Sequence, residues 1–121
     1  MPNFQIKVQD LANGIIYLEI EGLLDTYTYI RFKKEIDNLF EQSKYRLIVD
    51  MSRVEHLSTA GAGVFIDAIG IAQENKGNIV IIHPSPEAKE IFDLLGISQV
   101  CPIANNIESA IKILAKAKKF I

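Results

Sequence analysis

The segment Leu47–Val64, which reads LIVDMSRVEHLSTAGAGV, decides the fold. Its opening run Leu47-Ile48-Val49 is continuously apolar, which is typical of a short β-strand covered on both faces. We expect a short surface loop after Asp50 and then a helix that begins near Thr59 and ends at about Asn75. A buried strand followed by a helix predicts one β-α unit of an open, mostly parallel sheet.

The segments on either side of this unit predict the rest of the architecture. Asn13-Gly14 readily adopts the positive φ angles of a tight turn, so the first two strands should form a hairpin. The period of the apolar residues separates strands from helices elsewhere. In chain order we expect strands near residues 4–9 and 15–21, a helix at 26–40, a strand at 47–49, a helix at 59–75, a strand at 79–82, a helix at 86–95, a strand at 100–103 and a helix from 107.

This order predicts an α/β fold: a small mixed, mostly parallel sheet with an N-terminal antiparallel hairpin and about four helices. Capping residues mark several helix ends: Ser85 before Pro86 should start the third helix, Gly96 should end it, and Asn106 should cap the last. The helix after residue 58 has a wide apolar stripe and should be the most buried. From this helix, Phe65 and Ile69 should point toward the core. From the last helix, the residues expected to point toward the core are Ile107, Ala110, Ile111 and Leu114.

Composition narrows the class of protein. The 121 residues are 49% hydrophobic, which suits one domain over residues 1–121. A net charge of −2 lacks the basic surplus of a nucleic-acid binder. The single Cys101 excludes an internal disulfide, and His56 and His83 lack the partners of a metal site. The start, Met1-Pro2-Asn3, is unlike a secretory signal, and no apolar run approaches the ~20 residues of a spanning helix, so we expect a cytoplasmic protein away from membranes.

Ser58 and Thr59 are the candidate functional residues. Ligand sites in open α/β sheets lie beyond the carboxyl ends of strands, and a helix N-terminus there favours an anion such as a phosphate on either hydroxyl. Alternatively, the hydroxyls only cap the helix, while Gly61 and Gly63 let it approach the sheet closely. Asp25 ends another strand, so it could cap the first helix and border the surface of Thr59. The Ala-Gly-Ala-Gly run lacks the lysine of a nucleotide loop, which makes a nucleotide site or an enzyme the weakest reading.

Three segments in register resemble the STAS domain family, specifically stand-alone bacterial anti-sigma factor antagonists. Glu21–Asp25 resembles the Gly-Glu-Leu-Asp stretch before the first helix of the family. Val49–Val54 with Leu57–Val64 resembles its strand and phosphorylation loop, and Ser85–Ile97 resembles its third-helix region. The resemblance covers nearly the whole chain and implies the STAS fold.

The resemblance implies a regulatory binding module that is not an enzyme and needs no cofactor or metal. Members of the family bind an anti-sigma factor that is also a serine/threonine kinase, and so free a sigma factor. The kinase phosphorylates a hydroxyl of the central loop, which breaks the complex, and a PP2C-type phosphatase reverses this. Alignment through Gly61 places the acceptor at Thr59 and puts Ser58 where the family has Asp. The neighbouring hydroxyl of Ser58 is the second choice of acceptor.

The same alignment assigns a contact surface and leaves one alternative open. The residues expected to meet the partner are Asp25, Thr26, Ser58, Thr59, Gly61, Ala62 and Gly63. The alternative is an unphosphorylated STAS scaffold or sensor subunit, as in stress-sensing or lipid-transport complexes.

Overall fold

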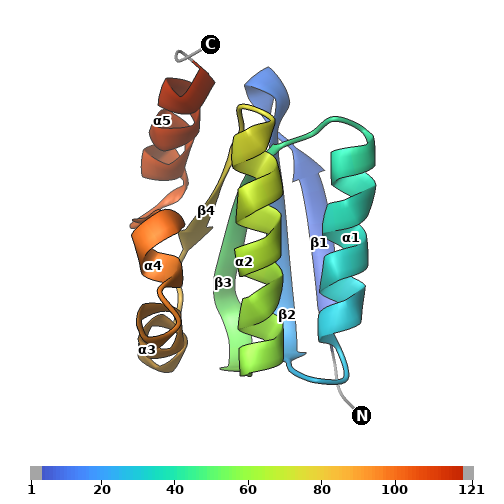
Figure 1. Ribbon diagram of the computed structural model, residues 1–121, viewed down its shortest axis with the longest axis vertical. Coiled ribbons are helices and arrows are strands. Elements are labelled where there is room, and N and C mark those ends of the chain that lie inside the picture. Colours follow the sequence, from blue (N-terminus) through green and yellow to red (C-terminus); the bar gives the residue numbers. More distant parts are fainter. Residues whose placement is uncertain (1–3, 119–121) are drawn as a thin grey trace.

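A five-stranded mixed sheet forms the centre of the computed structural model, which describes residues 4–118 (Figure 1). Its strands, in spatial and chain order, are β1 (Gln5–Asp10), β2 (Ile15–Leu24), β3 (Arg46–Leu57), β4 (Asn78–Ile82) and β5 (Ile103–Ala104). The helices are α1 (Tyr29–Glu41), α2 (Thr59–Glu74), α3 (Pro86–Leu94), α4 (Ile97–Val100) and α5 (Ile107–Lys118). β1 is antiparallel to β2 and the other pairs are parallel, which confirms the predicted fold class. The start segment Met1–Asn3 lies outside the described residues.

Local signals account for several turns and helix ends. The turn η1 (Ala12–Gly14) joins β1 to β2 with positive φ at Asn13 (65°) and Gly14 (72°), as expected for this pair. The Ser85 hydroxyl accepts the N–H of Ala88 at 3.0 Å at the start of α3, and the Asn106 side chain accepts the N–H of Ser109 at 2.8 Å at the start of α5. These predicted caps are confirmed.

Helices α1 to α4 cover one face of the sheet and share its main core. Phe65 of α2 is fully buried at the centre of this layer, and its ring centroid lies 5.2 Å from those of Phe32 and Phe92. Ile69 is buried with it, so the predicted inward face of α2 is confirmed. The aromatic contacts tie α2 to α1 on one side and to α3 on the other.

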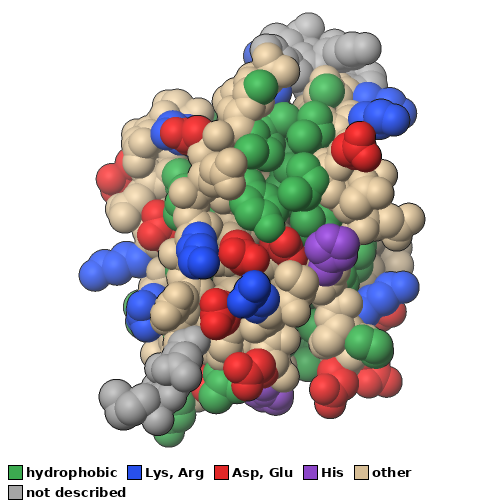
Figure 2. Space-filling view, turned by 180° about the vertical axis from the view of Figure 1, so that it is seen from behind, with side chains coloured by type: hydrophobic (Ala, Val, Ile, Leu, Met, Phe, Trp, Pro, Cys, Tyr) green, Lys and Arg blue, Asp and Glu red, His purple; other side chains and the backbone are tan. Residues whose placement is uncertain are grey.

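The opposite face is covered in part by α5, which packs through Ala110 and Leu114 against Ile48 and Val80 of the central strands. Seen from behind, a patch of hydrophobic side chains lies above a group of acidic and basic side chains (Figure 2). Ile107 was expected to point inward but is 38% exposed, because it occupies the first turn of α5, at the rim of this contact. No helix within residues 4–118 has the length and apolar character to cross a membrane.

The charged region of that face is a satisfied network on β2 and β3. Asp50 is 6% exposed and accepts hydrogen bonds from the Tyr17 hydroxyl and, at 3.0 Å, from the N–H of Ser52. Burial and the neighbouring Asp50 raise the pKa of Tyr17. Arg53 lies 3.4 Å from Glu19. Each of these named groups therefore has a partner, as buried polar groups in folded proteins usually do.

The main error of the sequence prediction concerns residues 50–57. They form no surface loop; they continue β3 to Leu57, paired with β2 through two register shifts. The shifts place exposed residues next to each other, as at Ser52-Arg53, which hides the alternation expected of a strand. In addition, α1 begins at Tyr29 rather than Thr26, and the short α4 was not predicted.

Candidate functional site

Thr59 occupies the exposed start of α2, directly after the single residue that separates this helix from β3. Its position beyond the carboxyl end of a central parallel strand is where open α/β sheets place their sites. Among the described residues, no hydrogen bond holds its hydroxyl. The predicted location of Thr59, at the exposed N-terminal end of this helix, is therefore confirmed.

Ser58 has a different role, because its hydroxyl is engaged. Its backbone is extended (φ −92°, ψ 170°), and its Oγ accepts the N–H of Gly61 at 3.2 Å as the N-cap of α2. Its own N–H donates to the Leu24 carbonyl at 2.9 Å, which joins the start of α2 to the end of β2. Of the two hydroxyl residues that the sequence offered as helix caps, Ser58 is therefore the cap and Thr59 is not.

Gly61 and Gly63 were both expected to let α2 approach the sheet closely, but only Gly61 does so. A Cβ atom at position 61 would lie 2.6 Å from the Leu24 carbonyl oxygen, so the close contact of α2 with β2 requires glycine. A Cβ atom at position 63 would meet nothing within 4 Å, and the expectation for Gly63 is wrong. Ala62 is fully buried, so its side chain faces the core and not a partner.

Asp25 organises the loop beside Thr59, between β2 and α1. Its Oδ1 accepts the N–H groups of Tyr27 at 2.9 Å and Thr28 at 3.1 Å. The hydrogen bond from Tyr27, with that from Thr28, lowers the pKa of Asp25, and the nearby His56 acts in the same direction. Thr28 is buried and donates its hydroxyl to the Leu23 carbonyl at 2.6 Å. The predicted capping by Asp25 therefore acts on the turn that precedes α1.

The exposed residues of this loop are Thr26 and Tyr27, and the sequence prediction missed Tyr27. Its side chain is 86% exposed, the largest exposure among the exposed large hydrophobic residues of the described chain. Exposed aromatic side chains are frequent anchors of protein interfaces. The position of Tyr27, two residues after Asp25 at the end of the predicted strand, could have marked it as a candidate surface residue. The sequence does not distinguish its exposure from the burial of Tyr29, which lies two residues later and packs against the core.

Within the part of the chain that the structure describes, the Thr59 hydroxyl has no neighbouring group that could activate it as a nucleophile. Among the described residues, no basic group hydrogen-bonds to Thr59, and no cluster of three His, Cys, Asp or Glu residues could hold a metal ion. The one cysteine, Cys101, is buried in the core, where its Sγ contacts the Ile79 carbonyl of β4, and burial raises its pKa to about 12. The fold and the site define a small α/β domain with an exposed threonine at the start of α2.

A model of the STAS domain family matches residues 5–110. The chain therefore belongs to the STAS domain family.

Relatives of the chain agree with this family. It is 22% identical over 103 residues to the anti-sigma-B factor antagonist of Listeria monocytogenes, which covers 85% of this chain and 90% of the relative. Among solved structures, an anti-sigma factor antagonist from Mycobacterium paratuberculosis superposes with a TM-score of 0.84 at 18% identity, over 93% of this chain and 95% of that one. The Bacillus cell fate determinant SpoIIAA in its phosphorylated form has a TM-score of 0.72 at 15% identity, over 90% and 99%.

Proposed function

We propose that this chain is an anti-sigma factor antagonist: a cytoplasmic, non-catalytic module that sequesters an anti-sigma factor kinase and is released by phosphorylation of Thr59. The observation that supports the proposal is that the two hydroxyls at the start of α2 differ in their hydrogen bonding. The Ser58 hydroxyl caps the helix, whereas Thr59 is exposed and its hydroxyl has no hydrogen-bond partner among the described residues. Thr59 is therefore available to a kinase.

Phosphorylation of Thr59 should leave the free protein folded. A phosphothreonine adds a charge of about −1.5 to −2 at pH 7. The cap uses the N–H of Gly61, and no partner among the described residues takes the N–H groups of Thr59 and Ala60. These groups and the helix dipole favour a negative charge at this place.

The same phosphate should weaken a complex that covers Thr59. Exposed Tyr27 and Thr26 belong to the same end of the molecule, because Leu24 contacts the start of α2 through both Ser58 and Gly61. A partner docked over this end would have to desolvate the phosphate. A loss of roughly 3–4 kcal/mol would lower the affinity by two to three powers of ten.

The test combines phosphate transfer with affinity, using the cognate anti-sigma factor kinase and labelled ATP. Thr59→Ala should bind the kinase and remain unlabelled, while Thr59→Glu should stay folded and bind more weakly. Ser58→Ala is the matched control: it loses the helix cap, at a cost of about 0.5–2 kcal/mol, but should still be labelled at Thr59.

Labelling of Thr59→Ala at the wild-type level would place the acceptor elsewhere, with Ser58 as the first residue to test. If neither hydroxyl is labelled and Thr59→Glu binds normally, the chain is an unphosphorylated STAS scaffold or sensor subunit. A kinase-like protein encoded beside this chain would supply the partner for both measurements.

A further inference from the structure

A continuous groove runs between α1 and α2, on the side of these helices that faces away from the sheet. Its two hollows share Lys33, Val64 and Asp67 as lining residues. One hollow reaches Ala60 near the start of α2, and the other reaches Ile71 near its end. These eleven steps along the helix correspond to about 16 Å, or three helical turns.

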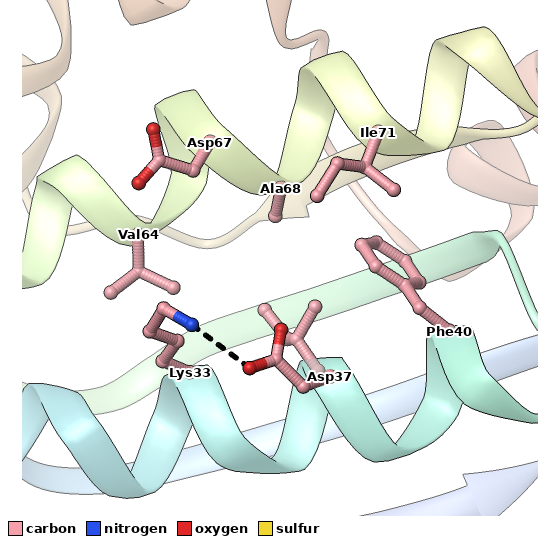
Figure 3. Close-up of a pocket in the computed structure, with 8 residues that line it drawn as sticks. Lys33, Asp37, Phe40, Val64, Asp67, Ala68 and Ile71 are labelled. Atoms are coloured by element: carbon pink, nitrogen blue, oxygen red, sulfur yellow. Dashed lines mark hydrogen bonds and ion pairs between the residues drawn. The ribbon is translucent and has the colours of Figure 1, made fainter.

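The hollow at the Ile71 end is a hole with apolar walls and with charged side chains at its rim. Val64, Ala68 and Ile71 point from α2 toward α1, and Phe40 points back from α1 (Figure 3). Its volume is about 50 Å³, several times the ~10–15 Å³ that one water molecule needs. The hole is partly open to solvent, and covering its apolar walls with an apolar group would remove them from water, so it fits the end of one aliphatic side chain.

Two apolar side chains flank the groove on α2 without being covered. Ile66 is 46% exposed and Ile71 is 42% exposed, although both belong to the apolar stripe of this helix. Gly63, on the same side of α2, has open space where its Cβ would be, which leaves the helix backbone accessible. This surface can therefore receive a second helix at short distance.

The charged side chains at the rim of the groove favour a partner with positively charged side chains. Lys33 and Asp37 form an ion pair at 2.9 Å, which already neutralises the only lysine of the lining. Asp67 has no ion pair within 4.0 Å among the described residues, so one lysine and two aspartates leave a net charge of −1. In addition, α2 contains no Lys or Arg. A cationic residue of a partner would find Asp67 available at this rim.

From the hole, the exposed isoleucines and Asp67, we infer that the α1–α2 groove is a docking surface for an amphipathic helix of another protein. That helix would place an aliphatic side chain in the hole and a Lys or Arg against Asp67, the recognition mode of a helix laid in a groove. Ala68 lies nine residues, or two and a half turns, beyond Thr59. This second surface does not depend on Thr59 as the phosphoacceptor.

The test uses a synthetic amphipathic peptide of about 11 residues, enough for three turns, with leucines on one face and lysines beside them. A matched peptide carries Glu in place of each Lys. Titration into the isotope-labelled full chain, followed by NMR, should shift amide signals of Lys33–Phe40 and Gly63–Ile71. The lysine peptide should bind more tightly, by up to about fivefold for each ion pair formed, the factor that corresponds to roughly 1 kcal/mol at the upper end for an exposed pair.

Variants localise the binding. Asp67→Lys should reverse the preference between the two peptides, and Ile71→Ala should weaken both, because it removes one wall of the hole. Leu94→Ala is the control, since Leu94 is 79% exposed and lies on α3 outside the groove. The inference is overturned if no groove signal shifts at about 1 mM peptide, or if the shifts centre elsewhere. Equal affinities of the two peptides, or an unchanged affinity of Ile71→Ala, would overturn it as well.

Discussion

Replacing Gly61 by alanine should destabilise the protein, whereas the same replacement at Gly63 should not. The added Cβ at position 61 would lie 2.6 Å from the Leu24 carbonyl oxygen and 2.7 Å from its Cγ, well inside van der Waals contact. The carbonyl cannot simply turn away, because it accepts the Ser58 N–H at 2.9 Å. Relief therefore requires the start of α2 to move away from β2.

The magnitude follows from two opposing effects. Overpacking of this kind costs about 1–3 kcal/mol, and weakening the Ser58–Leu24 hydrogen bond adds roughly 1 kcal/mol. Alanine is favoured over glycine inside a helix by up to ~1 kcal/mol, which offsets part of this cost. We expect Gly61→Ala to lose about 1–3 kcal/mol and Gly63→Ala, which meets no neighbour within 4 Å, to gain up to ~1 kcal/mol.

Urea unfolding followed by circular dichroism measures both variants, which differ from wild type by one methyl group each. Amide signals of Thr26–Thr28 should move in Gly61→Ala and stay in place in Gly63→Ala, because only the former separates α2 from the strand that leads into this loop. Equal unfolding midpoints for the two variants would refute the argument that contact with Leu24 demands glycine.

Phe65→Ala should cost about 3–5 kcal/mol, because its fully buried ring contacts two others, while Ile66→Ala, at a 46% exposed position, should change stability far less; comparable losses in thermal unfolding would contradict this. Asp25→Asn should reduce stability at neutral pH. Because folding lowers the pKa of Asp25 below its usual 3.8, this difference should be full above that value and vanish as the pH falls through the folded-state pKa; a difference that persists in acid would exclude the carboxylate as its cause. Cys101, whose pKa burial raises to about 12, should resist Ellman's reagent at pH 8 until urea unfolds the chain, and rapid labelling of the native protein would show that the thiol is accessible.

The sequence by itself determined the features that depend on residues within a few positions of one another. The Asn13-Gly14 turn and the caps at Ser85 and Asn106 follow from local backbone preferences, and the structure has each of them. The inward face of α2 follows from helical periodicity, which placed Phe65 correctly. The start of α2 at Thr59 could be predicted for the same reason, since a hydroxyl pair and an apolar stripe adjoin there.

Only the tertiary structure decided how these elements meet, because the responsible neighbours are distant in the chain. Strand β3 continues to Leu57 because β2 pairs with it along its whole length, and the register shifts of that pairing hide the alternation. Gly61 differs from Gly63 because Leu24, 37 positions earlier, lies against one and not the other. The groove likewise requires α1 and α2 side by side, and packing against a common sheet is what sets their separation.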